Sequence, residues 1–225
     1  MTATMVQPRV ALIDDHQLMR EDVATTLREG NCEPVFVTLQ DGSTEQIVAM
    51  ILETAQTALC DQRLGSMTSR TQGAEIVAEL TRRRVPAILY SERKEEDTPE
   101  LRRYFDLIPR FLNREELSQS DLLATFASIS REFEEGVPKE RRPYRTLIRV
   151  EEMLGRNRAA IAIPAWHVNE LVEISTDDIE PDIRTRVTAG TRLFAKVNLH
   201  AALAQSIFVK EFELAVPPEP SDGLA

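Results

Sequence analysis

Short apolar runs alternate with helical periodicities through the first 135 residues, and this alternation limits the folds open to the chain. Five runs are each bounded by polar or turn residues, as buried parallel strands are: RVALID (9–14), PVFVTL (34–39), TALCD (57–61), PAILYS (86–91) and PRFLN (109–113). Between them apolar residues recur at helical spacing: Met19, Val23 and Leu27; Ile47 and Ile51; Ile76, Val77 and Leu80; Leu122, Phe126, Ile129 and Phe133. Repeated strand and helix units predict an α/β fold with a doubly wound, five-stranded parallel sheet.

The pattern changes after residue 135. Gly136 and Pro138 are typical of a helix end, and the charged, proline-containing stretch 136–143 is typical of a linker. We therefore expect a first domain over residues 1–135 and a linker over 136–143.

The second half alternates with a period of two. Apolar and polar side chains alternate around Ile148 and Val150 and again through 193–197, which is a strand pattern. Three further apolar runs, a turn at Gly190 and a short helix within 175–187 complete the expectation. A small all-β barrel or sandwich over 144–215 would bury these strands, and the tail 216–225 is predicted to be disordered.

Carboxylates follow two of the apolar runs in the first domain. Asp14 and Asp15 close the first run, and Asp61 closes the third. Parallel strands place their carboxyl ends at one edge of the sheet, where open α/β sheets bind ligands. Three carboxylates that converge there repel one another, and a hard divalent cation with oxygen ligands relieves the repulsion. The sequence therefore predicts a Mg²⁺ site.

The order of these motifs resembles the receiver domain of two-component response regulators over residues 8–135. The family has an acidic pair after its first strand, a phosphorylatable Asp after its third and Ser or Thr after its fourth. Asp14, Asp15, Asp61 and Ser91 stand at the matching places. The resemblance implies the flavodoxin-like receiver fold, with Asp61 as the phosphoacceptor.

The resemblance also implies a role for each metal ligand. Asp15 would bind Mg²⁺ directly, and Asp61 would bind it through a carboxylate oxygen. Asp14 matches the acid that in the family often binds the metal through a water molecule. The backbone carbonyl of Arg63 would complete the protein ligands.

Three further positions match the family's phosphoryl and switch residues. Ser91 would donate its hydroxyl to a phosphoryl oxygen, and Phe111 stands at the aromatic switch position. Arg114 stands where the family has Lys, and its planar fork is not equivalent to a compact ammonium group. With Arg at this position, metal-dependent phosphoryl acceptance is still expected. The family's usual coupling from the phosphoryl group to the protein surface is in question.

Charge and cysteine content restrict the function classes. The chain carries 27 Lys and Arg against 37 Asp and Glu, and residues 139–225 hold 12 basic and 13 acidic side chains. A domain of such balanced charge is not expected to bind nucleic acid. Cys32 and Cys60 lie far apart without a CxxC pair, which argues against a zinc site. No signal peptide or membrane span is evident, so a cytoplasmic protein without a membrane partner is expected.

The functional hypothesis is a response-regulator-like protein that is not an independent enzyme. A histidine kinase or phosphotransfer protein would phosphorylate Asp61, and the β domain would act on a downstream protein effector; a homodimer is a possible assembly. Three alternatives stay open at this point. The receiver could be a phosphate sink, the β domain could make the protein a nucleic-acid-binding adaptor, or a degenerate receiver could serve as a dimerisation module.

Overall fold

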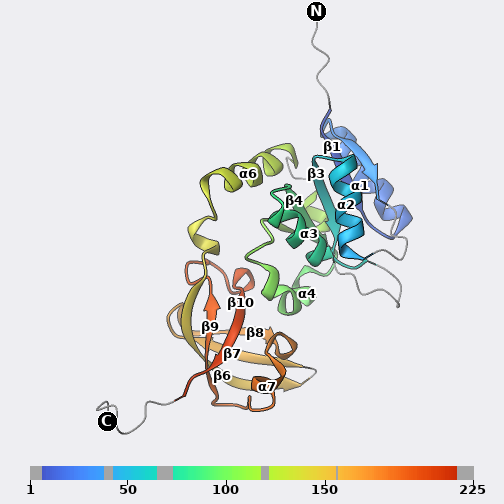
Figure 1. Ribbon diagram of the computed structural model, residues 1–225. Coiled ribbons are helices and arrows are strands. Elements are labelled where there is room, and N and C mark those ends of the chain that lie inside the picture. Colours follow the sequence, from blue (N-terminus) through green and yellow to red (C-terminus); the bar gives the residue numbers. More distant parts are fainter. Residues whose placement is uncertain (1–6, 38–42, 65–72, 118–121, 156, 217–225) are drawn as a thin grey trace, which may run out of the picture. The chain divides into compact units, whose positions relative to one another are not determined.

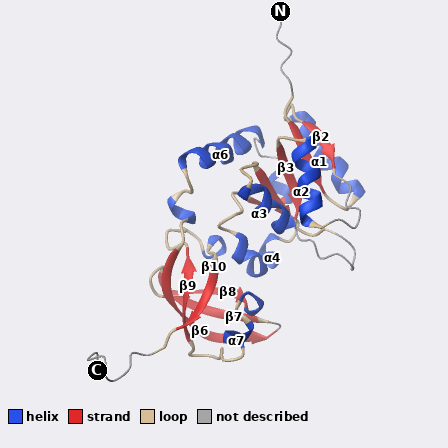
Figure 2. Ribbon diagram, in the orientation of Figure 1, coloured by secondary structure: helices blue, strands red, loops and turns tan. Residues whose placement is uncertain are grey.

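The computed structural model describes residues 7–37, 43–64, 73–117, 122–155 and 157–216 (Figures 1 and 2). Their contacts divide the chain into two compact units. The first unit contains residues 1–97 and 107–137, and the second contains 98–106 and 138–225. No helix among the described residues is long and apolar enough to cross a membrane.

A five-stranded parallel sheet is the centre of the first unit. Its strands follow the order β2-β1-β3-β4-β5, and every described pairing is parallel. The strands are β1 (Arg9–Ile13), β2 (Glu33–Phe36), β3 (Thr57–Asp61), β4 (Ala87–Ser91) and β5 (Phe111–Asn113). The predicted doubly wound sheet is confirmed, and each of the five strands overlaps its predicted run; residues 38–39 of the second run lie outside the described residues.

Helices cover both faces of this sheet. On one face α1 (Gln17–Glu29) and α6 (Leu122–Glu135) pack against β1, β3 and β4 in a continuous apolar cluster. On the other, α2 (Thr44–Thr54) and α3 (Gly73–Arg82) contact each other and the same strands. The buried strands are apolar on both faces for this reason.

Local signals in the sequence set the ends of the helices. Ser43 begins α2 with a capping box, in which its hydroxyl accepts from the Gln46 N–H and the Gln46 side chain accepts from the Ser43 N–H. Gly136 follows the last residue of α6 with φ of +93°, a left-handed conformation that suits glycine. The predicted helix end at Gly136 is confirmed.

The crossover from β4 to β5 contains two helical segments that the apolar periodicity did not predict. These are α4 (Lys94–Leu101) and the 3-10 helix η1 (Arg102–Tyr104). Residues 98–106 of this crossover belong to the second compact unit. We call residues 98–106 the crossover segment.

The second unit is built on one antiparallel sheet. Its strand order is β10-β9-β6-β7-β8, and all described pairings are antiparallel. The strands are β6 (Tyr144–Gly155), β7 (Arg158–Ile163), β8 (His167–Ser175), β9 (Arg192–Val197) and β10 (Val209–Leu214). The short helices η3 (Thr176–Asp178) and α7 (Pro181–Arg184) join β8 to β9. The expected all-β character and the short helix within 175–187 are confirmed.

The long strand β6 joins the two halves of this sheet. Its first half pairs with β9 and its second half with β7, and the register against β7 shifts twice, at β-bulges or similar irregularities. The described part of the second unit has an apolar core, which includes Ile148, Ile161, Val172 and Leu193.

Charged residues fix the crossover segment within the second unit. Arg102 is buried and donates hydrogen bonds to the backbone carbonyls of Glu173, Ala204 and Ile207. Three ion pairs add to these bonds: Arg103 with Asp178, Arg158 with Glu100, and Lys210 with Asp106. The second unit is therefore assembled from two parts of the sequence, whereas the sequence predicted domains in series. Of the predicted tail 216–225, residues 217–225 lie outside the described residues.

Candidate functional site

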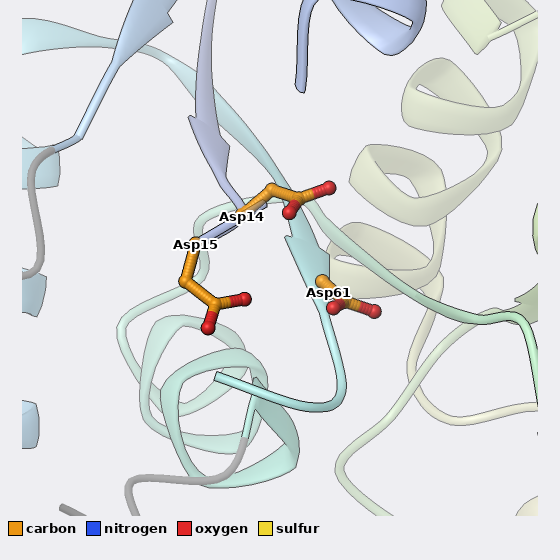
Figure 3. A group of neighbouring side chains, drawn as sticks. All are labelled: Asp14, Asp15 and Asp61. Carbon is orange, nitrogen blue, oxygen red and sulfur yellow. The ribbon is translucent and has the colours of Figure 1, made fainter. Parts of the chain in front are cut away.

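Three carboxylates gather where β1 and β3 end (Figure 3). One oxygen from each of Asp14, Asp15 and Asp61 lies within 4.8 Å of the other two. Asp14 is buried, Asp61 is half-buried and Asp15 is exposed. The cluster is therefore fixed on one side and open to solvent on the other.

Strand register explains the convergence. Ile13 on β1 lies opposite Cys60 on β3, so the next residues, Asp14 and Asp61, are neighbours at the ends of adjacent strands. Asp15 follows in the short connection that leads to α1 at Gln17. The predicted carboxylate cluster is confirmed as a geometric arrangement.

Burial and the neighbouring charges disturb the ionisation of Asp61. Burial raises the pKa of its carboxyl, and Asp14 and Asp15 add Coulombic repulsion; the backbone N–H groups of Gln62 and Arg63 oppose these effects. The result is a pKa of about 7. A cation beside Asp61 would favour its ionised form, which burial and the neighbouring carboxylates disfavour.

The donor set fits Mg²⁺. Every ligand that the cluster offers is a carboxylate oxygen, the type that hard divalent cations prefer, and no soft sulfur or imidazole nitrogen belongs to the cluster of described residues. The small number of protein ligands also suits an ion that keeps several of its waters.

Two donors hold the Asp14 carboxylate from different elements. The backbone N–H of His16 donates to Oδ1 at 2.8 Å, and the phenol of Tyr90 donates to Oδ2 at 2.7 Å. Burial and the charge of Asp14 raise the pKa of Tyr90, so its hydroxyl stays protonated and remains a donor. Both carboxylate oxygens of Asp14 are therefore oriented by the fold.

The first turn of α3 fixes the chain that follows Asp61. The Gly73 N–H donates to the Gln62 carbonyl at 3.0 Å, and the Ala74 N–H donates to the Gln62 side chain at 3.1 Å. A Cβ atom on Gly73 would lie 1.9 Å from the Asp61 carbonyl oxygen. Since real Cβ atoms do not come so close, residue 73 must be glycine for this packing.

No protein-family model matches the sequence, and no curated protein matches it. Among solved structures, a response regulator receiver domain protein from Clostridium thermocellum matches 57% of this chain and 98% of its own, at 14% identity and a TM-score of 0.43. The Francisella response regulator 1452 receiver domain matches 54% and 99% at 14% identity and a TM-score of 0.40. NtrX from Brucella abortus matches 60% and 30% at 17% identity and a TM-score of 0.44.

The strand order assigns the fold independently of these overlaps. A parallel sheet in the order 2-1-3-4-5 with helices on both faces is the doubly wound arrangement of flavodoxin and CheY. The first unit has the flavodoxin-like, doubly wound fold. Nothing in these comparisons assigns the second unit.

The other predicted site positions lie on β4 and β5 or directly after β5. Ser91 ends β4, is buried, and lies opposite Asn113 on β5; its hydroxyl oxygen accepts from the Arg93 N–H at 3.0 Å. A hydroxyl can donate while it accepts, so this bond is compatible with the predicted role of Ser91.

Arg114 begins the short helix α5 (Arg114–Leu117), directly after β5. One of its terminal nitrogens pairs with Glu92 at 2.9 Å. The other, Nη2, is buried and has no hydrogen-bond partner among the described residues. Phe111, on β5, is half-buried, with the Lys94 ammonium 5.7 Å from its ring centre.

Sequence reasoning missed three residues around the carboxylate cluster: Tyr90, Gln62 and Gly73. Tyr90 lies inside a run that reads as an ordinary apolar strand, and its polar contact depends on strand order and register. A glycine that opens an amphipathic helix was the one available signal for Gly73. Gln62 carried no signal in the sequence.

Proposed function

We propose that the receiver domain accepts a phosphoryl group on Asp61 from a histidine kinase or a phosphotransfer protein in the cytoplasm. The observation that carries this proposal is the meeting of Asp14, Asp15 and Asp61 within 4.8 Å at the carboxyl edge of the sheet. Asp61 is the carboxylate that ends the central strand β3. Its neighbour Asp14 directly follows β1, the adjacent strand. The receiver acts on itself and is not an independent enzyme.

The carboxylates of Asp14, Asp15 and Asp61, with the backbone carbonyl of Arg63, would hold Mg²⁺. When bound, the ion screens the charge between an anionic donor and an anionic nucleophile. Two protein donors, the His16 N–H and the Tyr90 hydroxyl, already orient the Asp14 carboxylate.

The transfer itself requires Asp61 to be ionised. A carboxylate oxygen of Asp61 attacks the phosphorus of a phosphohistidine, a P–O bond forms, and the P–N bond breaks with its electron pair returning to the imidazole nitrogen. The product is an aspartyl phosphate. Ser91 donates its hydroxyl to one phosphoryl oxygen, and the unpartnered Nη2 of Arg114 supplies a charged donor to another.

We infer that the second unit is the output of the protein and acts through protein contacts, with Phe111 as the aromatic residue that responds by packing. The crossover segment favours this reading over a phosphate sink, because these residues lie between β4 and β5 in the sequence and yet belong to the second unit. A protein effector and a homodimer are both compatible with such an output.

Phosphorylation with a small donor tests this proposal. The intact chain is incubated with acetyl phosphate and Mg²⁺, and its mass is measured with and without EDTA. We expect one base-labile phosphoryl adduct that needs Mg²⁺ and is lost in Asp61→Asn and in the double variant Asp14→Ala/Asp15→Ala. Asp22→Asn, an exposed acid on α1, is the matched control. An adduct that persists in Asp61→Asn would refute the assignment.

A further inference from the structure

Tyr90 reaches across a whole strand to contact Asp14. The strand order is β1-β3-β4, with Asp14 following β1 and Tyr90 on β4, so β3 lies between them. The register sets Asp14, Asp61 and Tyr90 at one level: Cys60 lies opposite Ile13, and Asp61 lies opposite Tyr90. Two strand spacings amount to about 10 Å, which a tyrosine and an aspartate side chain can together span.

The contact is buried and lies on the face covered by α1 and α6. Tyr90 is fully buried and belongs to the apolar cluster with Leu12, Leu59 and Phe126. Its ring is fixed by this packing, so its hydroxyl has a fixed position next to the Asp14 carboxylate. A phenylalanine would fill the same space, and the hydroxyl is therefore not needed for packing.

The bond leaves Asp14 one orientation. With Oδ1 held by His16 and Oδ2 held by Tyr90, rotation of the carboxylate would break two hydrogen bonds, one of them in an apolar environment. Each oxygen still has a second lone pair for a cation or for a cation-bound water. A ligand that is already oriented loses less conformational freedom when the cation binds.

We propose that Tyr90 is a positioning residue for the divalent cation, which it serves by fixing the Asp14 carboxylate across β3. This inference rests on the proposed function, because it concerns the Mg²⁺ site that phosphorylation uses. Magnesium demands near-ideal octahedral geometry, so a fixed carboxylate contributes more to its affinity than a mobile one. Removing a residue that orients a metal ligand typically weakens metal binding about 10-fold to 100-fold.

A double-mutant cycle on Mg²⁺ affinity tests the proposal without any phosphodonor. The proteins are the parental chain, Tyr90→Phe, Asp14→Asn and the double variant, and Mg²⁺ is titrated while backbone amide shifts around Asp61 are followed by NMR. Tyr90→Phe should weaken Mg²⁺ binding about 10-fold or more in the parental background. In the Asp14→Asn background it should have little further effect, because the ligand that it positions has been replaced.

Either of two other results of this cycle overturns the proposal. Equal weakening in both backgrounds would mean that Tyr90 acts through the fold in general, and unchanged affinity would mean that it does not act on the cation. If Tyr90→Phe does not fold, Tyr90→Met fills much of the space without a donor, and the same comparison applies. Absence of Mg²⁺ binding in the parental chain would refute the proposed function itself, which separates the two failures.

Discussion

Arg102 donates a hydrogen bond of 2.6 Å to the backbone carbonyl of Glu173, a residue 71 positions further along the chain. That bond comes from Nε, and Nη1 of the same side chain donates to the carbonyls of Ala204 and Ile207. One buried guanidinium therefore joins the crossover segment, β8 and the chain before β10. Burial lowers the pKa of Arg102 to about 10, and the group is still charged at neutral pH.

Arg102→Ala should therefore destabilise the second unit. The change leaves three carbonyls without their donor, and each unsatisfied buried group costs about 1–3 kcal/mol. Hydrogen exchange should show loss of protection in β8 and β10, with the parallel sheet of the first unit unchanged. Arg131→Ala, on the exposed side of α6, is the control and should have little effect. Equal protection in Arg102→Ala and Arg131→Ala would contradict this account.

The same contacts predict that the fragment 138–225 does not fold alone. It lacks the crossover segment, and with it Arg102 and the partners of Asp178, Arg158 and Lys210. Circular dichroism of the fragment should show no cooperative thermal transition, whereas the full chain should. A cooperative transition in the fragment would show that the crossover segment is dispensable.

Gly73→Ala should slow the Mg²⁺-dependent phosphorylation of Asp61. The added Cβ meets the Asp61 carbonyl oxygen at 1.9 Å, so the phosphoacceptor strand or α3 must shift. Overpacking of this kind costs about 1–3 kcal/mol. Gly30→Ala is the matched control, since its Cβ would lie 3.4 Å from the nearest atom, at a negative φ. Comparable rates of Mg²⁺-dependent phosphorylation in the two variants would refute the close approach.

The stability of the metal-free protein should fall as the pH rises from about 4 to 7. The pKa of Asp61 is about 7 in the folded protein, against 3.8 ordinarily, so the folded state binds more protons than the unfolded state in this window. A shift of this size corresponds to at most about 4 kcal/mol. Urea unfolding at pH 5 and pH 8 in EDTA measures the loss, which should shrink in Asp61→Asn and with added Mg²⁺. An equal slope in Asp61→Asn would assign the pH dependence to other groups.

Nucleic-acid binding by the full chain should be absent at physiological salt. The register of β6 and β9 sets Arg145 opposite Lys196, a cationic pair that net charge alone did not reveal. However, Glu213 pairs with Arg145 and Glu211 with Lys196, so neighbouring carboxylates balance these charges. Fluorescence anisotropy with a labelled single strand tests this. Micromolar binding that weakens steeply with salt would favour the adaptor hypothesis.

The sequence was sufficient to predict the parallel sheet and the carboxylates at its edge, because both depend on local patterns. A short apolar run that ends in Asp carries its own signal for a buried strand and for a ligand at its end, as TALCD did for Asp61. Gly136 likewise carried a local signal for the end of α6.

Contacts between distant segments could not be predicted in this way. Tyr90 meets Asp14 because of strand order and register, which no run of residues displays. Arg102 lies in a short, weakly amphipathic stretch whose partners are 71 to 105 residues away, so its place in the second unit was invisible to periodicity. The predicted domain boundary near residue 136 rests on a change of pattern in the sequence, and that pattern carries no sign that residues 98–106 join the second unit.

The most direct measurement of the central claim is the position of the phosphoryl group. The parental chain is phosphorylated with acetyl phosphate and Mg²⁺ and then reduced with borohydride, which converts an aspartyl phosphate to homoserine, and its peptides are sequenced by mass spectrometry. The account predicts homoserine at position 61 and unmodified aspartate at Asp14 and Asp15. Homoserine at another position, or none in a chain that binds Mg²⁺, would contradict it.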